Sequence, residues 1–359
     1  MTSMRPLKPR NLSSGPVSAP IEMPKNLPPE NKLPPNWTNR IKLQGANMEP
    51  FVRRSHLLVP VLDREKVEAS WTHNADSVIL DLTGIESEDD RSRARSLVKE
   101  SIRHASRGGA HVFVLPNKVM ARADIEASVW PGLKGIVYPG AETSADIEEA
   151  DSILSELETG RGIASGVLQI IALIDSGTGV WNIREIVTAS PRVCSSGLDE
   201  LNLCRNMGII PYADFDPFVY AKGRIVVETR AAKVQPIGIS HPYGVLPQFD
   251  DADEIYQQAL RGKNLGFAGA ICPDPSWVVQ CNTAFAPPAD RLEFFRETRR
   301  LFAEGVAQGT AAVPYPGTTM MIDVPVDENA RVNLELWELC AAREAEKAKA
   351  IEKQESTMA

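Results

Sequence analysis

The chain has 359 residues, of which 43% are hydrophobic and 24% charged, a composition that can fill a large core. Its formal net charge of −8 at pH 7 excludes a general nucleic-acid binder, because such a protein presents a basic face to phosphates. The five cysteines show no CxxC spacing, which argues against a zinc site or a disulfide framework and favours a reducing compartment. No apolar stretch approaches the roughly 20 residues of a membrane span.

Residues 1–50 form the first region and hold ten of the 27 prolines. Proline removes backbone donors and interrupts helices, so this region is predicted to be an extended arm that lies against the body, against a neighbouring subunit or in solvent. Three basic residues and no acid precede Glu22, as in a mitochondrial transit peptide. The prolines spoil the amphipathic helix of such a peptide, and a cytoplasmic location is therefore the expectation.

Short apolar runs alternate with helical segments from about residue 54 onwards. The runs are HLLVP (56–60), SVILDL (77–82), HVFVL (111–115), GIVYP (135–139), LQIIALI (168–174), RVCSSG (192–197), QPIGIS (235–240) and AGAIC (268–272). Nearly continuous apolar strands indicate burial on both faces, as in a parallel sheet. Eight such strands with intervening helices predict an α/β fold, a (β/α)₈ TIM barrel over 51–310, followed by a C-terminal segment and helix at 311–359. A doubly wound open sheet is the alternative, although no GxGxxG follows the first strand.

In a TIM barrel the chemistry lies where the strands end, because the βα loops meet there. Two acidic residues, Asp175 after the fifth run and Glu200 after the sixth, could hold one hard cation such as Mg²⁺. The alternative is that Asp175 caps the next helix and that Glu200 is a solvated acid in a first turn. His241 is a candidate base, Trp277 could wall the pocket, and Gly177 could let the backbone approach an anion.

Several segments occur in the same order as in a known family: RSHLLVP, DSVILDL, GIVYPGAETSADIEEA, ALIDSGTGVWNIREI, ASPRVCSSGLDEL, LGFAGAICPDPSWV and MMIDVPV. Together, over roughly residues 53–345, they resemble the HpcH/HpaI aldolase and citrate lyase β-subunit group, which includes malyl-CoA lyases and CitE-like proteins. The resemblance implies a TIM barrel, carbon–carbon lyase or condensing activity on acyl-CoA thioesters with Mg²⁺ or Mn²⁺, and a trimer or hexamer.

Four positions keep the chemical character of the family motifs. Arg54 matches the basic residue of the RSxLFVP segment, and the two metal carboxylates fall on Asp175 and Glu200, with the side-chain lengths exchanged. Asp323 matches the aspartate that such enzymes use as an acid/base and deliver to a neighbouring subunit. The alternative for Asp323 is a cap of the C-terminal helix, which is predicted to begin near Asp327 and thus too far along for a direct cap.

Other positions depart from the family. Thr83 and Gly84 stand where the family has Glu-Asp, Phe113 replaces the substrate-binding arginine, Leu115 replaces an asparagine, and Gly140 replaces a lysine. Exchanging a guanidinium for a phenyl ring removes a bidentate clamp and a positive charge. The chain is therefore not expected to be a standard malyl- or citryl-CoA lyase. Three interpretations remain open: a divergent enzyme for a bulkier and less anionic substrate, a non-catalytic protein that binds acyl-CoA or another protein, and a scaffold subunit.

Overall fold

The computed structural model describes residues 51–210, 215–239 and 251–358. The predicted N-terminal arm (1–50) and the candidate base His241 lie outside these residues. Among the described helices, none is long and apolar enough to cross a membrane.

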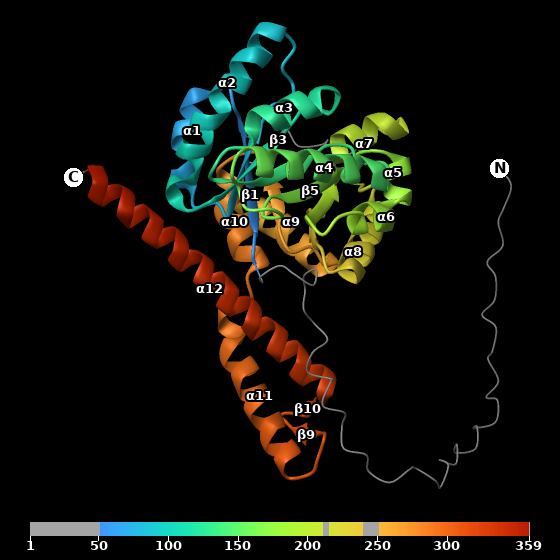
Figure 1. Ribbon diagram of the computed structural model, residues 1–359. Coiled ribbons are helices and arrows are strands. Elements are labelled where there is room, and N and C mark those ends of the chain that lie inside the picture. The colour runs from blue at the N-terminus through green and yellow to red at the C-terminus, as the bar shows by residue number, and fades with distance from the viewer. Residues whose placement is uncertain (1–50, 211–214, 240–250, 359) are drawn as a thin grey trace, which may run out of the picture. The chain divides into compact units, whose positions relative to one another are not determined.

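Eight parallel strands form the centre of the fold (Figure 1). They are β1 (Ser55–Pro60), β2 (Ser77–Asp81), β3 (His111–Leu115), β4 (Leu133–Tyr138), β5 (Gln169–Ile174), β6 (Val193–Leu198), β7 (Gln235–Ile237) and β8 (Ala270–Cys272). The hydrogen-bonded order β7-β6-β5-β4-β3-β2-β1-β8 follows the chain around a ring. Two backbone bonds link the remaining edges, from the Gly238 amide to the Gly269 carbonyl (2.8 Å) and from the Ala268 amide to the Pro236 carbonyl (2.9 Å). The predicted barrel is confirmed, and the doubly wound alternative is wrong because its strand order would reverse at a switch point.

The strands are buried on both faces, as their continuous apolar sequences predict. One set of side chains fills the barrel interior, namely Ile79, Phe113, Val137, Ile171, Leu173, Cys194 and Ile237. The alternate set packs outward against the helices and forms the larger core. The middle of the barrel interior is therefore apolar, and polar chemistry at the mouth has to come from the strand ends and loops.

The helices return the chain from each strand to the next. They are α1 (Arg64–Ala69), α2 (Glu88–Ala105), α3 (Ala121–Ser128), α4 (Ser144–Gly160), α5 (Gly177–Trp181), α6 (Ile183–Thr188), α7 (Glu200–Met207), α8 (Val219–Ala232), α9 (Ala252–Leu265) and α10 (Ser276–Phe285). Local sequence explains several ends: Ser87 caps α2, and Thr143 forms a capping box with Asp146 at α4. Gly266 ends α9 at φ +111°, a left-handed conformation that favours glycine.

The C-terminal segment contains α11 (Leu292–Ala307), a short hairpin of β9 (Val313–Pro314) and β10 (Met321–Ile322), and α12 (Val324–Met358). The later part of α12 packs at the amino ends of the strands, where Arg343 donates to the carbonyls of Asp76 (2.6 Å) and Gly109 (2.7 Å). The start of this helix corrects a prediction. It begins at Val324, not near Asp327, so the helix is close enough for Asp323 to cap it.

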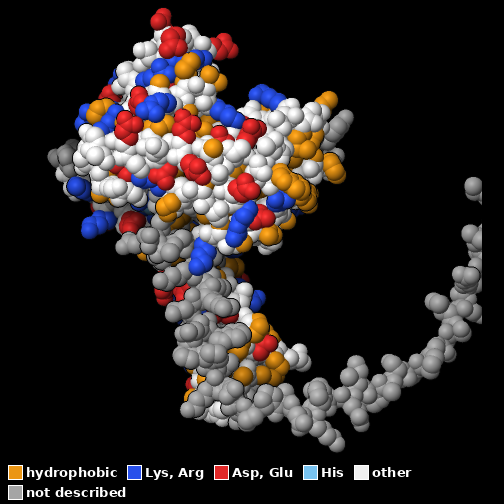
Figure 2. Space-filling view, turned by 45° about the vertical axis from the view of Figure 1, so that its right-hand side comes forward, with side chains coloured by type: hydrophobic (Ala, Val, Ile, Leu, Met, Phe, Trp, Pro, Cys, Tyr) orange, Lys and Arg blue, Asp and Glu red, His pale blue; other side chains and the backbone are white. Residues whose placement is uncertain are grey.

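One face of the barrel exposes large apolar side chains on and beside α5, α7 and α8. They are Trp181, Leu201, Met207, Ile210, Phe215, Val219, Tyr220 and Val227. Figure 2 shows hydrophobic side chains gathered at the right of the barrel, the side on which Figure 1 places these helices. Exposed apolar side chains in such a number are typical of an interaction surface.

Candidate functional site

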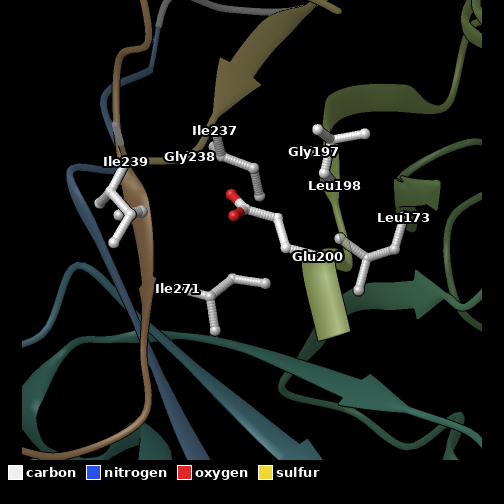
Figure 3. A pocket seen from close by; sticks show the side chains of 9 residues that line it. Leu173, Gly197, Leu198, Glu200, Ile237, Gly238, Ile239 and Ile271 are labelled. Carbon is white, nitrogen blue, oxygen red and sulfur yellow. The ribbon is translucent and has the colours of Figure 1, made fainter. Parts of the chain in front are cut away.

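The mouth at the carboxyl ends of the strands contains a small cavity of about 30 Å³. Its lining comes from the ends of β5 to β8 and consists of Leu173, Gly197, Leu198, Glu200, Ile237, Gly238, Ile239, Ala270 and Ile271. Figure 3 shows the Glu200 carboxylate pointing into this space among the isoleucine side chains. The cavity is close to the volume of one water molecule. The mouth thus combines a single acid with apolar walls.

Glu200 is the first residue of α7 and is only 5% exposed. The alternative that it is a solvated acid is therefore wrong. The Lys222 ammonium of α8 lies 3.2 Å from Glu200 Oε1 and 2.7 Å from Asp216 Oδ2, and this lysine is 1% exposed. Burying a charged group costs several kcal/mol unless an opposite charge compensates it. Lys222 therefore places a positive charge beside Glu200 inside the mouth.

Asp175 follows β5, and Asp199 follows β6 directly opposite, because Ile174 and Leu198 are register partners. The Asp199 amide also donates to the Ile174 carbonyl at 2.8 Å. Burial raises the pKa of Asp175, Lys118 opposes this shift, and the negative charges of Asp199 and Glu142 add to it. The alternative in which Asp175 caps the next helix is also wrong, since the Ser176 side chain accepts from the Gly179 amide at the start of α5.

Gly140 provides the space that Asp175 and Lys118 share. A Cβ atom at Gly140 would lie 2.5 Å from Asp175 Oδ2 and 2.8 Å from Lys118 Nζ, and the residue has φ +60°. The Lys118 ammonium donates to the Gly140 carbonyl at 2.6 Å. A lysine therefore reaches this position from the loop after β3, although the sequence has glycine at the end of β4.

Asp81 adds a further carboxylate at the end of β2. Burial raises its pKa, with a contribution from Asp199, while hydrogen bonds from Thr83 act in the other direction. Both the Thr83 amide and its hydroxyl donate to Asp81 Oδ1 at 2.7 Å. Thr83, predicted to bind substrate, thus holds an acid of the mouth in place.

Acidic groups outnumber the lysines that contact them in this part of the chain. The carboxylates are Asp81, Glu142, Asp175, Asp199, Glu200 and Asp216, and the lysines are Lys118 and Lys222. Carboxylate oxygens and leftover negative charge suit a hard divalent cation. The residues described form no cluster of three or more His, Cys, Asp or Glu ligands, so such a cation would also need water or substrate oxygens. With that condition, the residues fit Mg²⁺.

On β3, no positively charged side chain points into the barrel interior toward the mouth. Phe113 is fully buried, and Leu115 packs against the same inner cluster. The guanidinium of Arg53 lies 5.0 Å from the Phe113 ring centroid. This group belongs to the amino end, where it donates to His111 Nδ1 (2.9 Å) and Gln169 Oε1 (2.6 Å). β3 therefore offers no positive charge to an anionic group at the mouth.

The remaining candidates do not gather at the mouth. Arg54 precedes β1 and pairs with Asp76 at 2.8 and 2.9 Å, and with Glu344 of α12, at the amino end of the barrel. Trp277 is buried in the outer core, at 3% exposure. Asp323 is exposed and accepts from the Val326 amide at 3.2 Å. Gly177 is exposed at the start of α5, and its amide donates to Asn206 Oδ1 at 3.1 Å.

Sequence reasoning missed Lys118, Lys222, Asp81 and Asp199. The two aspartates occupy strand ends, so the rule that identified Asp175 could have identified them as well. Lys222 had a weaker signal, a lysine in a helix whose buried positions otherwise include Ala221, Ile225 and Thr229.

Comparisons with known proteins show the family of the chain and agree with the barrel fold. The model of the HpcH/HpaI aldolase/citrate lyase family matches residues 54–275. The citrate lyase subunit beta of Leuconostoc mesenteroides subsp. cremoris is 27% identical over 77% of this chain and 90% of its own. An L-malyl-CoA/beta-methylmalyl-CoA lyase of Cereibacter sphaeroides is 24% identical over 86% of this chain and 98% of its own. The structure of CitE from Mycobacterium tuberculosis in complex with magnesium, acetoacetate and coenzyme A superimposes with a TM-score of 0.59 at 21% identity, over 80% of this chain and 98% of that one.

Proposed function

We propose that the chain, which belongs to the HpcH/HpaI aldolase/citrate lyase family, is a carbon–carbon lyase or condensing enzyme that acts on an acyl thioester. One observation carries this proposal: acidic residues follow the adjacent carboxyl ends of β5 and β6, and one of them, Glu200, points into an apolar cavity. A CoA thioester is the substrate class that the names of the relatives support. The substrate is not malyl-CoA or citryl-CoA, because Phe113 offers no positive charge to a second carboxylate.

Asp175 and Glu200 are the residues that would hold Mg²⁺, or Mn²⁺ in its place. When bound, the cation would act as a Lewis acid and stabilise negative charge on a carbonyl oxygen. Cleavage of the Cα–Cβ bond of a β-hydroxyacyl thioester turns the β carbon into a carbonyl as a base takes its hydroxyl proton, and leaves the bonding electron pair on the thioester fragment as an enolate. Fixed positive charge near the enolate oxygen lowers the barrier. Lys118 is positioned to add such a charge, since its ammonium lies beside Asp175 and Gly140 at the rim.

The apolar wall sets which acyl group can enter. Ile237, Ile239 and Ile271 surround the Glu200 carboxylate and exclude water from one side of it (Figure 3). Leu115 and Phe113 extend this character along β3. Since the cavity itself holds about one water molecule, an acyl chain would lie across these side chains; aliphatic or aromatic carbon would bury apolar surface on them, whereas a free carboxylate would lose hydration without gaining a partner.

The acid/base is Asp323 of a neighbouring subunit. Within its own chain Asp323 lies just before α12, exposed, with one carboxylate oxygen used for the helix cap. The apolar side chains on α5, α7 and α8 give a surface on which copies of the chain could assemble as a trimer or hexamer. Arg54 has a structural role in this proposal, because Asp76 and Glu344 occupy its guanidinium.

A non-catalytic protein that binds acyl-CoA or another protein is the second candidate, with a scaffold subunit as a variant of it. One observation favours it: the two proposed metal ligands already have lysine partners, because Lys222 contacts Glu200 and Lys118 lies near Asp175. Such a protein would need neither a cation nor an acid/base.

Titration of the full chain with Mg²⁺ and Mn²⁺ by calorimetry, followed by assays on a panel of acyl-CoA thioesters, tests the proposal. Glu200→Gln and Asp175→Asn should each weaken cation binding at least about tenfold and abolish thioester cleavage. Glu148→Gln, an exposed acid on α4, is the matched control and should change neither. Cation binding and cleavage that are equal in all four proteins would overturn the assignment, and binding of thioesters without turnover would favour the second candidate.

A further inference from the structure

A groove unrelated to the mouth lies on the outside of the barrel, where α2 ends and β4 begins. It encloses about 430 Å³ and is lined by Lys99, Arg103, Trp130, Pro131 and Arg161. A second hollow of about 490 Å³ continues along α2, shares Lys99 and Arg103, and adds Arg107. The end of α2, the turn before β4 and the end of α4 all lie at the amino ends of the strands. The groove is therefore at the opposite end of the barrel from the proposed reaction.

Three cations of α2 and the turn after it line the groove and the hollow that continues it, with Glu100 as the acid among them. Lys99, Arg103 and Arg107 follow one another at four-residue spacing, so they share one face of α2 and its continuation. Within the described parts of the chain, none of the three takes part in an ion pair. Other arginines of the same helix do: Arg95 lies 2.7 Å from Asp124, for example. The acid at the groove, Glu100, is directed to His104 at 3.6 Å.

Trp130 supplies a flat apolar surface among these charges. The Lys99 ammonium lies 4.0 Å from its ring centroid and the Arg161 guanidinium 4.6 Å. The indole N–H donates to the Ala127 carbonyl at 2.7 Å, and Arg161 is held by the carbonyls of Glu126 and Val129. The ring and Arg161 are thus held by hydrogen bonds, whereas Lys99 is exposed and its ammonium contacts only the ring face among the described residues.

We propose that this groove binds a nucleoside di- or triphosphate, with the base stacked on Trp130 and the phosphates held by Lys99, Arg103 and Arg107. Guanidinium groups bind phosphate through paired hydrogen bonds, and an aromatic side chain stacks on any base. Lys99 and Arg107 are about 12 Å apart along the helix axis, and their long side chains can converge from this distance on a shorter triphosphate. A nucleic-acid strand is the less favoured ligand, because the chain as a whole carries a net charge of −8 and would repel a long polyanion.

Calorimetric titration of the full chain with ATP, inorganic triphosphate, adenosine and a single-stranded oligonucleotide tests the proposal. ATP should bind more tightly than triphosphate and far more tightly than adenosine. Trp130→Leu should weaken ATP binding about 5- to 100-fold, the range that loss of one stacked base predicts, and leave triphosphate binding within about twofold. Arg103→Gln should weaken both ligands about tenfold. Arg93→Gln, an exposed arginine on α2 outside the groove, is the matched control and should change neither.

Three results would overturn the proposal. Absence of ATP binding would leave the groove without a ligand of this class. Equal affinity for ATP and triphosphate, with no effect of Trp130→Leu, would reduce it to an electrostatic surface for anions. Tighter binding of the oligonucleotide than of ATP would make it a nucleic-acid surface. Circular dichroism of each variant checks folding, and Trp130→Phe, which retains an aromatic ring, should bind ATP within about threefold of the original if stacking is the cause.

Discussion

At the amino end of the barrel the buried charges of Arg54, Asp76 and Lys347 are paired with one another, whereas at the carboxyl end the acids among the described residues outnumber the lysines that contact them. Asp76 illustrates the first case: it accepts from the Arg54 amide and guanidinium and from the Lys347 ammonium at 2.8 to 2.9 Å. Burial alone would raise the pKa of Asp76, yet Arg54 and Lys347 hold it below its usual range. At the mouth the balance differs, and burial raises the pKa values of Asp81 and Asp175.

The difference indicates that the charges at the amino end stabilise the fold, whereas those at the carboxyl end are available for binding. When charged groups are paired within one chain, as Asp76 is with Arg54 and Lys347, they stabilise the fold whether or not a ligand is bound. Carboxylates without enough positive charge around them are stabilised when a cation binds, and this stabilisation favours cation binding. The experiments below ask whether each end of the barrel behaves in this way.

The largest effect should come from breaking the amino end. Asp76→Asn leaves Arg54 and Lys347 without their buried counter-charge, and we expect the free energy of unfolding to fall by about 4 to 5 kcal/mol, as for other broken buried pairs. Urea denaturation measures this loss. Mg²⁺ should not restore the lost stability, because the mouth is at the other end. Recovery of stability with Mg²⁺ would show that the two ends are coupled.

A smaller effect is expected from removing the buried cation at the mouth. Lys222→Met leaves Glu200 and Asp216 facing each other without an ammonium, at a cost of about 2 to 3 kcal/mol in the absence of metal. In excess Mg²⁺ part of this loss should return, since ligand binding to the folded state stabilises it. Thermal unfolding with and without Mg²⁺ measures the difference. If both conditions give the same loss, the acids at the mouth do not form a cation site.

Lowering the pH should reduce the free energy of unfolding, because a histidine at the amino end of the barrel is buried in its neutral form. Burial and the nearby Arg53 lower the pKa of His56 to about 3, whereas an unfolded histidine titrates near 6.5. The unfolded chain therefore binds a proton that the folded chain does not, so this contribution is present above about pH 6.5 and is lost as the pH falls toward 3. By pH 5 the stability lost in this way amounts to roughly 2 kcal/mol. His56→Gln should show a shallower fall in unfolding free energy between pH 7 and pH 5. An unchanged slope would mean that His56 is charged in the fold.

Sequence predicted the barrel well because buried parallel strands are apolar along their whole length, so β1 to β8 could be recognised one by one. The site was harder. Asp175 and Glu200 follow strands and were found, but their lysine partners come from other elements, and no local pattern pairs Lys118 with Asp175. Lys347 reaches Asp76 across 271 residues of chain, a contact that only the fold reveals. Arg54 could have been placed correctly, because it precedes its strand and so lies at the amino end of a barrel.

The smallest effect is expected from adding a single methyl group at Gly140, at the rim of the mouth. Gly140→Ala adds one Cβ atom that would lie 2.5 Å from Asp175 Oδ2 and 2.8 Å from Lys118 Nζ, at a residue with φ +60°. Gly84→Ala is the matched control, since Gly84 has φ +69° and no heavy atom within 4 Å of the new Cβ. Both variants should lose about 1 to 2 kcal/mol of stability from the left-handed backbone.

The Gly140→Ala variant should also displace Asp175 or Lys118, because contacts of this length cannot be kept, and its affinity for Mg²⁺ should fall about tenfold. The control should bind Mg²⁺ as the original chain does, because its strain is the same and its surroundings are empty. Urea denaturation compares the stabilities, and calorimetry compares the affinities. Equal Mg²⁺ affinity in the two variants would separate Gly140 and its neighbours from the cation site and move the proposed chemistry to the Glu200 side of the mouth.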